Sequence, residues 1–107
     1  MLMVSIMANP LRESARGKEC LVRIPYVCNG NSDTVVLAHL NGAGVANKMH
    51  DLHGAFCCSS CHDQLDGRVK SLFSKDELKL MHLEGIKRTQ DYWLSTGHVT
   101  IQKPKNY

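Results

Sequence analysis

Large aromatic side chains are scarce in this sequence of 107 residues. Phe, Trp and Tyr together make up 6% of the chain, with one Trp and two Phe. A single small domain with so few large side chains can build only a modest hydrophobic core. We therefore expect the fold to draw additional stability from a bound metal or from an oligomeric partner.

Several common signatures are also missing from the sequence. The apolar opening, residues 1–10, has no basic residues ahead of it and is too short to span a bilayer, which argues against a signal peptide or a membrane anchor. No P-loop, dinucleotide fingerprint, Ser–His–Asp triad or internal repeat is found. The net charge of +3 permits nucleic-acid binding without requiring it. We expect an intracellular protein with reduced thiols and no membrane association.

The five cysteines are the most informative residues that are present. An odd number of cysteines without a secretory signal favours metal ligation over a disulfide framework. Cys20 and Cys28 are separated by seven residues, and Cys58 and Cys61 form a C-x-x-C pair. These four residues, hereafter the cysteine cluster, predict one tetrahedral zinc site, the alternative being a set of ordinary buried cysteines. The side chain of Cys57 is expected to point away from this zinc site and to pack against other residues.

The first half of the chain predicts short elements. Residues 10–19 predict one or two helical turns that end at Gly17. Residues 20–28 predict a short strand broken by a proline, and the β-branched run 34–40 predicts a clearer strand. The Gly- and Asn-rich segment 41–50 is expected to be an exposed loop.

Two helices are predicted in the second half of the chain. The first begins near Ser59 or Ser60, either of which could be its N-cap. The second starts at Ser74, whose spacing from Glu77 forms a capping box, and ends at Gly97. We expect this long helix to bury an apolar face made of Leu78, Met81, Ile86, Trp93 and Leu94. Strands followed by helices indicate a small α+β fold.

Two histidines and one aspartate are the candidate catalytic residues. His39 ends the predicted strand, where a lone histidine is more often structural, and it fits a general base that activates water. His62 directly follows a predicted zinc ligand, and Asp51 opens the segment that leads to the C-x-x-C pair. His62 and Asp51 fit ligands of a divalent ion on the scissile phosphate. The loop 41–50 could then lie along a nucleic-acid backbone.

Other polar residues near these candidates have simpler interpretations. Asp63 and Asp66 are expected to compensate the dipole at the start of the first predicted helix. His82 and His98 have no assigned role.

Four blocks of the chain resemble, in order, the YbcO-type nucleases of phages and prophages. The blocks are LRESARGKECLVRIPYVCNGN, TVVLAHL, CSSCHDQLDGR and LEGIKRTQDYWLSTG, and together they cover about residues 11–101. That family is similar in turn to the HNH zinc-finger nucleases, including the phage Ref recombination-enhancement nuclease.

The resemblance implies a zinc-stabilised, HNH-like ββα-metal core with flanking helices. It places structural zinc on the cysteine cluster and assigns the first, middle and last HNH positions to His39, Asp51 and His62. It also implies catalysis with Mg²⁺ or Mn²⁺, DNA as substrate, phage recombination proteins as partners and the cytoplasm of a bacterial host as location. The expected domain spans 10–102, with a flexible extension at 1–9 and a loose tail at 103–107.

Two positions depart from the common HNH pattern. The residue before the base histidine usually ligates the catalytic metal, and here it is Ala38. The middle position carries Asp51 in place of the usual Asn, and it lies two residues further from Cys58. The alternative to an endonuclease is therefore a non-catalytic zinc module that binds nucleic acid or a recombination protein.

Overall fold

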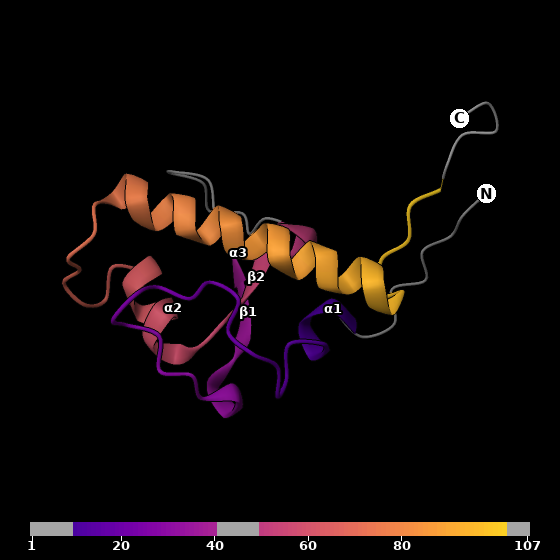
Figure 1. Cartoon of the computed structure of the whole chain (residues 1–107), viewed down its shortest axis with the longest axis horizontal. Helices are drawn as coiled ribbons and strands as arrows, with labels where there is room; N and C mark the ends of the chain where they lie inside the picture. Colours follow the sequence, from indigo (N-terminus) through magenta and orange to yellow (C-terminus); the bar gives the residue numbers. More distant parts are fainter. Residues whose placement is uncertain (1–9, 41–49, 103–107) are drawn as a thin grey trace.

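Short helices, one hairpin and one long helix make up the fold. The computed structural model describes residues 10–40 and 50–102, so the predicted extension 1–9, most of the predicted loop 41–50 and the tail 103–107 lie outside the described residues. The described elements are α1 (Pro10–Glu13), the 3₁₀ turn η1 (Ser32–Thr34), β1 (Val36–His39), the 3₁₀ turn η2 (Asp51–His53), β2 (Gly54–Cys57), α2 (Ser59–Leu65) and α3 (Lys75–Thr96) (Figure 1). The predicted α+β class is confirmed, and no described helix is both long and apolar enough to cross a membrane.

Strands β1 and β2 form an antiparallel hairpin that α2 follows directly in the chain. Val36 lies opposite Cys57, and His39 lies opposite Gly54. This register brings the end of β1 next to η2, because η2 immediately precedes β2. The hairpin thus delivers His39 and the η2 residues to one edge of the molecule.

Helix α3 lies across the hairpin and closes the core (Figure 1). Its Trp93 is fully buried and meets the buried Phe56 of β2 edge to face, with ring centroids 5.9 Å apart. The Trp93 indole Nε1 donates a hydrogen bond to Ser14 Oγ over 2.7 Å. Because Ser14 follows α1, one side chain of α3 joins the N-terminal segment to the hairpin.

Local signals set the ends of α3 as predicted. Ser74 and Glu77 form both hydrogen bonds of a capping box, and Gly97 ends the helix at φ +80°. The predicted apolar face is only partly correct, because Leu94 is 41% exposed. The buried positions of α3 also include residues that an apolar pattern does not select, namely His82, Gly85 and Thr89.

The predicted strand over 20–28 is wrong. The segment is an irregular loop with a turn after Ile24, where both Val27 N and Cys28 N donate to Ile24 O. Arg23 and Tyr26 adopt the left-handed region, at φ 56° and 65°. The chain must reverse here to bring both of its cysteines to one place, and an extended strand could not do so.

The start of α2 also differs from prediction. Its N-cap is Cys58, whose Sγ accepts a hydrogen bond from Cys61 N at 3.5 Å, and not Ser59 or Ser60. Sulfur is a weak acceptor, so the sequence signal for this cap is faint.

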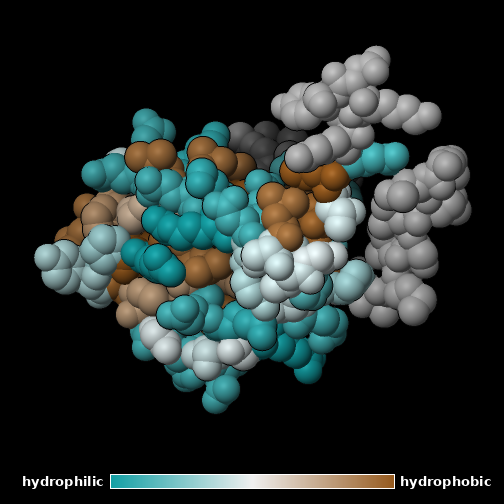
Figure 2. Space-filling model, turned by 45° about the vertical axis from the view of Figure 1, so that its right-hand side comes forward, coloured by the Kyte–Doolittle hydropathy of each residue, from teal (hydrophilic) through white to brown (hydrophobic). Residues whose placement is uncertain are grey.

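Figure 2 shows one face on which hydrophilic residues predominate and apolar residues lie among them in small groups. Leu72, Leu80 and Leu83 are among the larger apolar side chains exposed in the described residues.

Candidate metal centre and catalytic site

The cysteine cluster converges as the spacing predicts. Its four Sγ atoms all lie within 4.8 Å of one another, and the sulfurs of Cys28 and Cys58 are 3.9 Å apart. A tetrahedron with Zn–S bonds of about 2.3 Å has edges of about 3.8 Å, so this separation suits a zinc ion. Cys20, Cys58 and Cys61 are buried, which suits a closed structural site.

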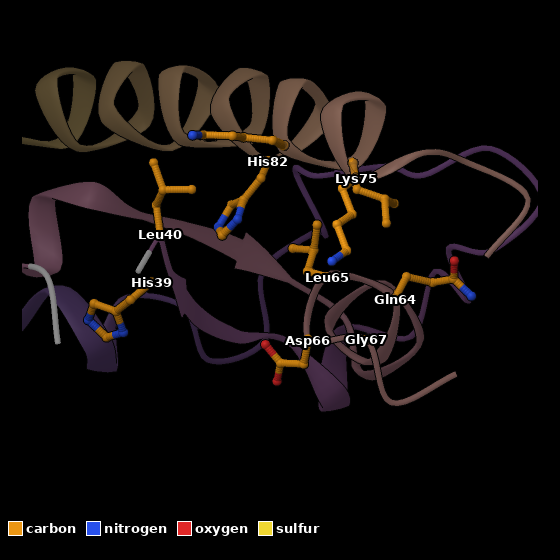
Figure 3. A pocket seen from close by; sticks show the side chains of 10 residues that line it. His39, Leu40, Gln64, Leu65, Asp66, Gly67, Lys75 and His82 are labelled. Atoms are coloured by element: carbon orange, nitrogen blue, oxygen red, sulfur yellow. The ribbon is translucent and has the colours of Figure 1, made fainter. Parts of the chain in front are cut away.

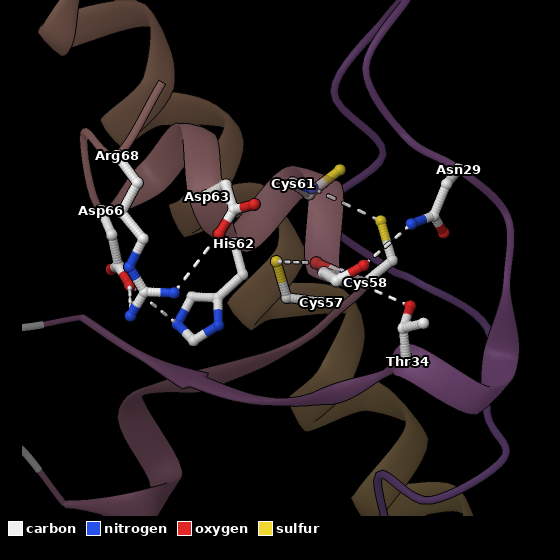
Figure 4. Close-up of polar contacts among 10 residues, drawn as sticks. Asn29, Thr34, Cys57, Cys58, Cys61, His62, Asp63, Asp66 and Arg68 are labelled. Atoms are coloured by element: carbon white, nitrogen blue, oxygen red, sulfur yellow. Dashed lines mark hydrogen bonds and ion pairs between the residues drawn. The ribbon is translucent and has the colours of Figure 1, made fainter. Parts of the chain in front are cut away.

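Two separate segments deliver the four sulfurs. The loop between Cys20 and Cys28 is attached to β2, because Leu21 N donates to Phe56 O at 2.8 Å. Cys58 and Cys61 come from the first turn of α2 (Figure 4). The cluster therefore joins the N-terminal loop to the hairpin and to α2.

The thiols of this centre interact strongly. Hydrogen bonds from Cys57 and Cys61 lower the pKa of Cys20, and the bond to Cys20 is the main cause of the raised pKa values of Cys57 and Cys61. Cys57 lies outside the four converging ligands and is fully buried, as packing requires. Its Sγ donates to Cys58 O at 3.5 Å and lies apart from the sulfurs of Cys58 and Cys61 (Figure 4).

His39 and Asp51 meet at the edge formed by β1 and η2. His39 Nε2 lies 2.6 Å from Asp51 Oδ1, and Arg12 Nε of α1 lies 3.3 Å from the same oxygen. Burial alone would raise the pKa of Asp51, but the hydrogen bonds from His39 and Arg12 outweigh it, so the pKa is lowered. The carboxylate therefore stays ionised beside the imidazole, which is only 13% exposed.

His62 lies on α2 and pairs with a different carboxylate. His62 Nε2 is 3.3 Å from Asp66 Oδ2, one helical turn further along (Figure 4). Arg68 contacts both Asp63 and Asp66, at 3.3 and 3.2 Å. The predicted dipole compensation by Asp63 and Asp66 is wrong, because the first turn of α2 carries no acidic residue and Asp66 is its C-cap.

The pair of His39 and Asp51 makes no described contact with the pair of His62 and Asp66. Within residues 10–40 and 50–102, the cysteine cluster is the only group of three or more potential metal ligands that converges. No described contact joins His62 to Asp51. A shared ion on these two residues therefore stays a prediction.

A cavity of about 610 Å³ connects the neighbourhoods of the two pairs. His39 and Asp66 both line it, together with His82 of α3 (Figure 3). His82 is 6% exposed, and its Nε2 lies 2.9 Å from Ala38 O. Because a carbonyl oxygen can only accept a hydrogen bond, Nε2 must be the donor. Burial lowers the pKa of His82, so the neutral ring with its proton on Nε2 is favoured.

Three residues at this site, Asp66, His82 and Arg12, were given no catalytic or binding role from the sequence. Asp66 follows His62 at the i, i+4 spacing that places metal ligands on one helix face, and this signal was available. His82 lies four residues before Ile86, on the same inward face of α3, so the helical spacing could have predicted that His82 is buried. Nothing in the sequence links Arg12 to Asp51, because 39 residues separate them.

Residues 9–98 match the family described as "Putative nuclease YbcO". Two relatives with that name, from Escherichia coli K12 and from Enterobacteria phage 82, are each 47% identical over 90 residues, which is 81% of this chain and 93% of theirs.

A solved structure is similar as well. It is titled "Structure of a putative bacteriophage protein from Escherichia coli str. K-12 substr. MG1655". The TM-score is 0.71 at 44% sequence identity, and the match covers 82% of this chain and all of the other.

Proposed function

The chain belongs to the YbcO nuclease family, and we propose that it is a metal-dependent endonuclease of the HNH type that hydrolyses phosphodiester bonds in DNA. The observation that carries the proposal is the pair of His39 and Asp51 at 2.6 Å, placed at the end of the hairpin where β1 ends and η2 leads into β2. A strand–strand–helix unit pinned by four cysteines is the framework that the HNH resemblance implies. One relative comes from a phage, which supports a role in phage DNA processing or recombination.

His39 is proposed as the general base. The ionised Asp51 accepts a hydrogen bond from the Nε2–H group of His39. This bond fixes the tautomer in which Nδ1 is free to accept a proton. Water held at Nδ1 would lose a proton as it attacks phosphorus. Asp51 is then a positioning residue, and Arg12 holds its carboxylate in place.

The catalytic ion is proposed to lie at His62. Asp51 was the carboxylate ligand predicted from the sequence, but its Oδ1 is already shared by His39 and Arg12. We propose Asp66 in its place, because Asp66 Oδ2 lies 3.3 Å from His62 Nε2. Mg²⁺ needs few protein ligands, since waters and substrate phosphates complete its shell. Bound Mg²⁺ or Mn²⁺ would stabilise charge developing on the phosphate and on the leaving oxygen.

Zinc on the cysteine cluster is proposed to be structural. Its four sulfurs leave no position for water or substrate in a tetrahedral shell. Cys58 both belongs to the cluster and caps α2, so the metal would set the orientation of the helix that carries His62.

A second candidate, a non-catalytic zinc adapter, is favoured by Ala38. This residue occupies the position of a usual metal ligand, and it is 2% exposed with its carbonyl bonded to His82. An adapter would bind nucleic acid or a recombination protein without cutting.

Nicking of supercoiled DNA with added Mg²⁺ or Mn²⁺ tests the proposal. His39→Ala should lower the rate by about 10²–10⁴-fold, the usual contribution of a general base. Asp51→Asn, which keeps the shape of the side chain, should cause a smaller loss. His53→Ala is the matched control, because His53 is an exposed histidine on the same 3₁₀ turn as Asp51.

Each variant must retain bound zinc and the wild-type far-UV circular dichroism. Equal cleavage by wild type and His39→Ala would refute the assignment of the base. Wild-type protein that binds DNA but never cuts it, with any divalent metal, would establish the adapter.

A further inference from the structure

The cavity beside His39 has the size and the walls of a ligand site. Its volume of about 610 Å³ falls within the range of about 300–1,000 Å³ that is typical of small-molecule sites. Leu40, which directly follows β1, lines it with apolar surface, as do Leu65 of α2 and Leu78 of α3. Figure 3 shows residues of α2 and α3 on either side of this space, with His39 at one end.

Two buried polar side chains line the same cavity. Gln64 is 8% exposed, and its Nε2 donates to Lys70 O at 3.3 Å. The Gln64 carbonyl Oε1 is buried without a hydrogen-bond partner in the part of the chain that the structure describes. His82 uses Nε2 to bond Ala38 O, so its Nδ1 remains an acceptor. His82 can therefore accept a hydrogen bond from a ligand, whereas the Gln64 amide points away from the space between His39 and His82 (Figure 3).

Two lysines of α3 add positive charge to the cavity. Lys75 and Lys79 stand one helical turn apart, and both line the space while remaining exposed. Neither forms an ion pair with a described residue, whereas Lys87, further along α3, pairs with Asp91 at 3.3 Å. Unpaired lysines one turn apart suit phosphate groups.

We propose that this cavity receives one unstacked nucleotide next to the position of cleavage. This inference rests on the proposed nuclease function and specifies its substrate as single-stranded nucleic acid or a strand with an unpaired nucleotide. The apolar wall would pack against the base, and Lys75 and Lys79 would bind the adjoining phosphates. The Watson–Crick edge of every base carries an N–H donor, and His82 Nδ1 would accept its hydrogen bond. A base inside a duplex is stacked and paired, and it cannot enter such a pocket without being extruded.

Binding without added divalent ions tests the proposal separately from cleavage. Fluorescence anisotropy would compare a dye-labelled single strand with a duplex of the same sequence. A second series would use short DNA strands that are abasic except at the centre, which carries adenine, its deamino analogue purine, or no base. We expect tighter binding to the single strand, and at least about 5-fold tighter binding to adenine than to the abasic centre, the lower end of a base–protein contact.

Four variants assign the contacts. His82→Phe keeps a ring of similar shape without an acceptor nitrogen, and it should abolish the preference for adenine over purine. Lys75→Gln and Lys79→Gln should each weaken binding and lower the slope of log affinity against log salt by about 0.7. Lys87→Gln is the matched control on α3 and should change neither quantity.

The outcomes separate this proposal from the proposed function. Equal affinity for single strand and duplex together with equal affinity for adenine and abasic centres would refute the pocket, even if the protein cleaves DNA. Effects of Lys75→Gln and Lys79→Gln no larger than that of Lys87→Gln would refute it too. Base-dependent binding that is lost in these variants supports the pocket, even where the nicking assay finds no cleavage.

Discussion

Thr89 joins α3 to the hairpin through one buried hydroxyl group. Its Oγ1 accepts a hydrogen bond from Phe56 N at 3.0 Å and donates to Gly85 O at 2.8 Å, and the residue is fully buried. We predict that Thr89→Val, which keeps the shape of the side chain, destabilises the protein. The substitution leaves the buried N–H of Phe56 without an acceptor, which costs about 1–3 kcal/mol.

The matched control is Thr89→Ser, which keeps the hydroxyl and removes one methyl group. It should cost about 1 kcal/mol for the lost apolar burial. Urea unfolding with saturating zinc measures both variants. With an m-value of about 2 kcal/mol/M, a loss of 2 kcal/mol moves the midpoint by about 1 M.

Amide hydrogen exchange at Phe56 gives an independent readout. In Thr89→Val this amide should lose protection relative to its neighbours, and in Thr89→Ser it should not. A Thr89→Val protein as stable as wild type, with Phe56 protected, would refute the role of this hydroxyl.

Three further predictions concern the cysteine cluster, Gly85 and His82. Stripping metal from the cysteine cluster with a chelator should unfold the domain, seen as loss of far-UV circular dichroism that added zinc restores, because such sites contribute folding free energy directly. Gly85→Ala should destabilise the protein by about 1 kcal/mol in urea unfolding, because the new Cβ would lie 3.0 Å from Val22 Cα, and this crowding exceeds the gain in helix propensity. A Gly85→Ala protein more stable than wild type would contradict that contact. Stability should fall as the pH drops below 6.5, because burial lowers the pKa of His82 from 6.5 in the folded state and the unfolded chain then binds the proton more tightly. The same pH titration of His82→Gln should show a smaller loss, and an identical profile would rule out this contribution.

Sequence reasoning succeeded where the signal is local. The boundaries of α3 follow from a capping box at Ser74 and a glycine at position 97, both of which act within a few residues. These two signals depend on neighbours in the chain, so they can be read before any fold is known. The cysteine cluster joins more distant segments, and it was predictable because few donor types suit a tetrahedral zinc site.

It failed where the contact partner is distant. The 20–28 segment has the composition of a strand, yet the need to bring its two cysteines together turns it back through Arg23 and Tyr26. The contacts of Asp51 with Arg12 of α1 and His39 of β1 were likewise not predicted, because 39 residues separate Arg12 from Asp51. Only the three-dimensional arrangement of these segments decides which partner a carboxylate takes.

The bond between Trp93 and Ser14 also has a consequence for the order of events during synthesis. The two residues are 79 positions apart, so the ribosome must make nearly the whole domain before this bond can form. The last ligand of the cysteine cluster, Cys61, is made earlier, and at about 5–20 residues per second the stretch from there to Trp93 takes about 2–6 s. For those seconds the nascent chain has all four thiols but not the helix that covers its core. A zinc ion captured in that interval would hold the hairpin and the first turn of α2 together until α3 arrives.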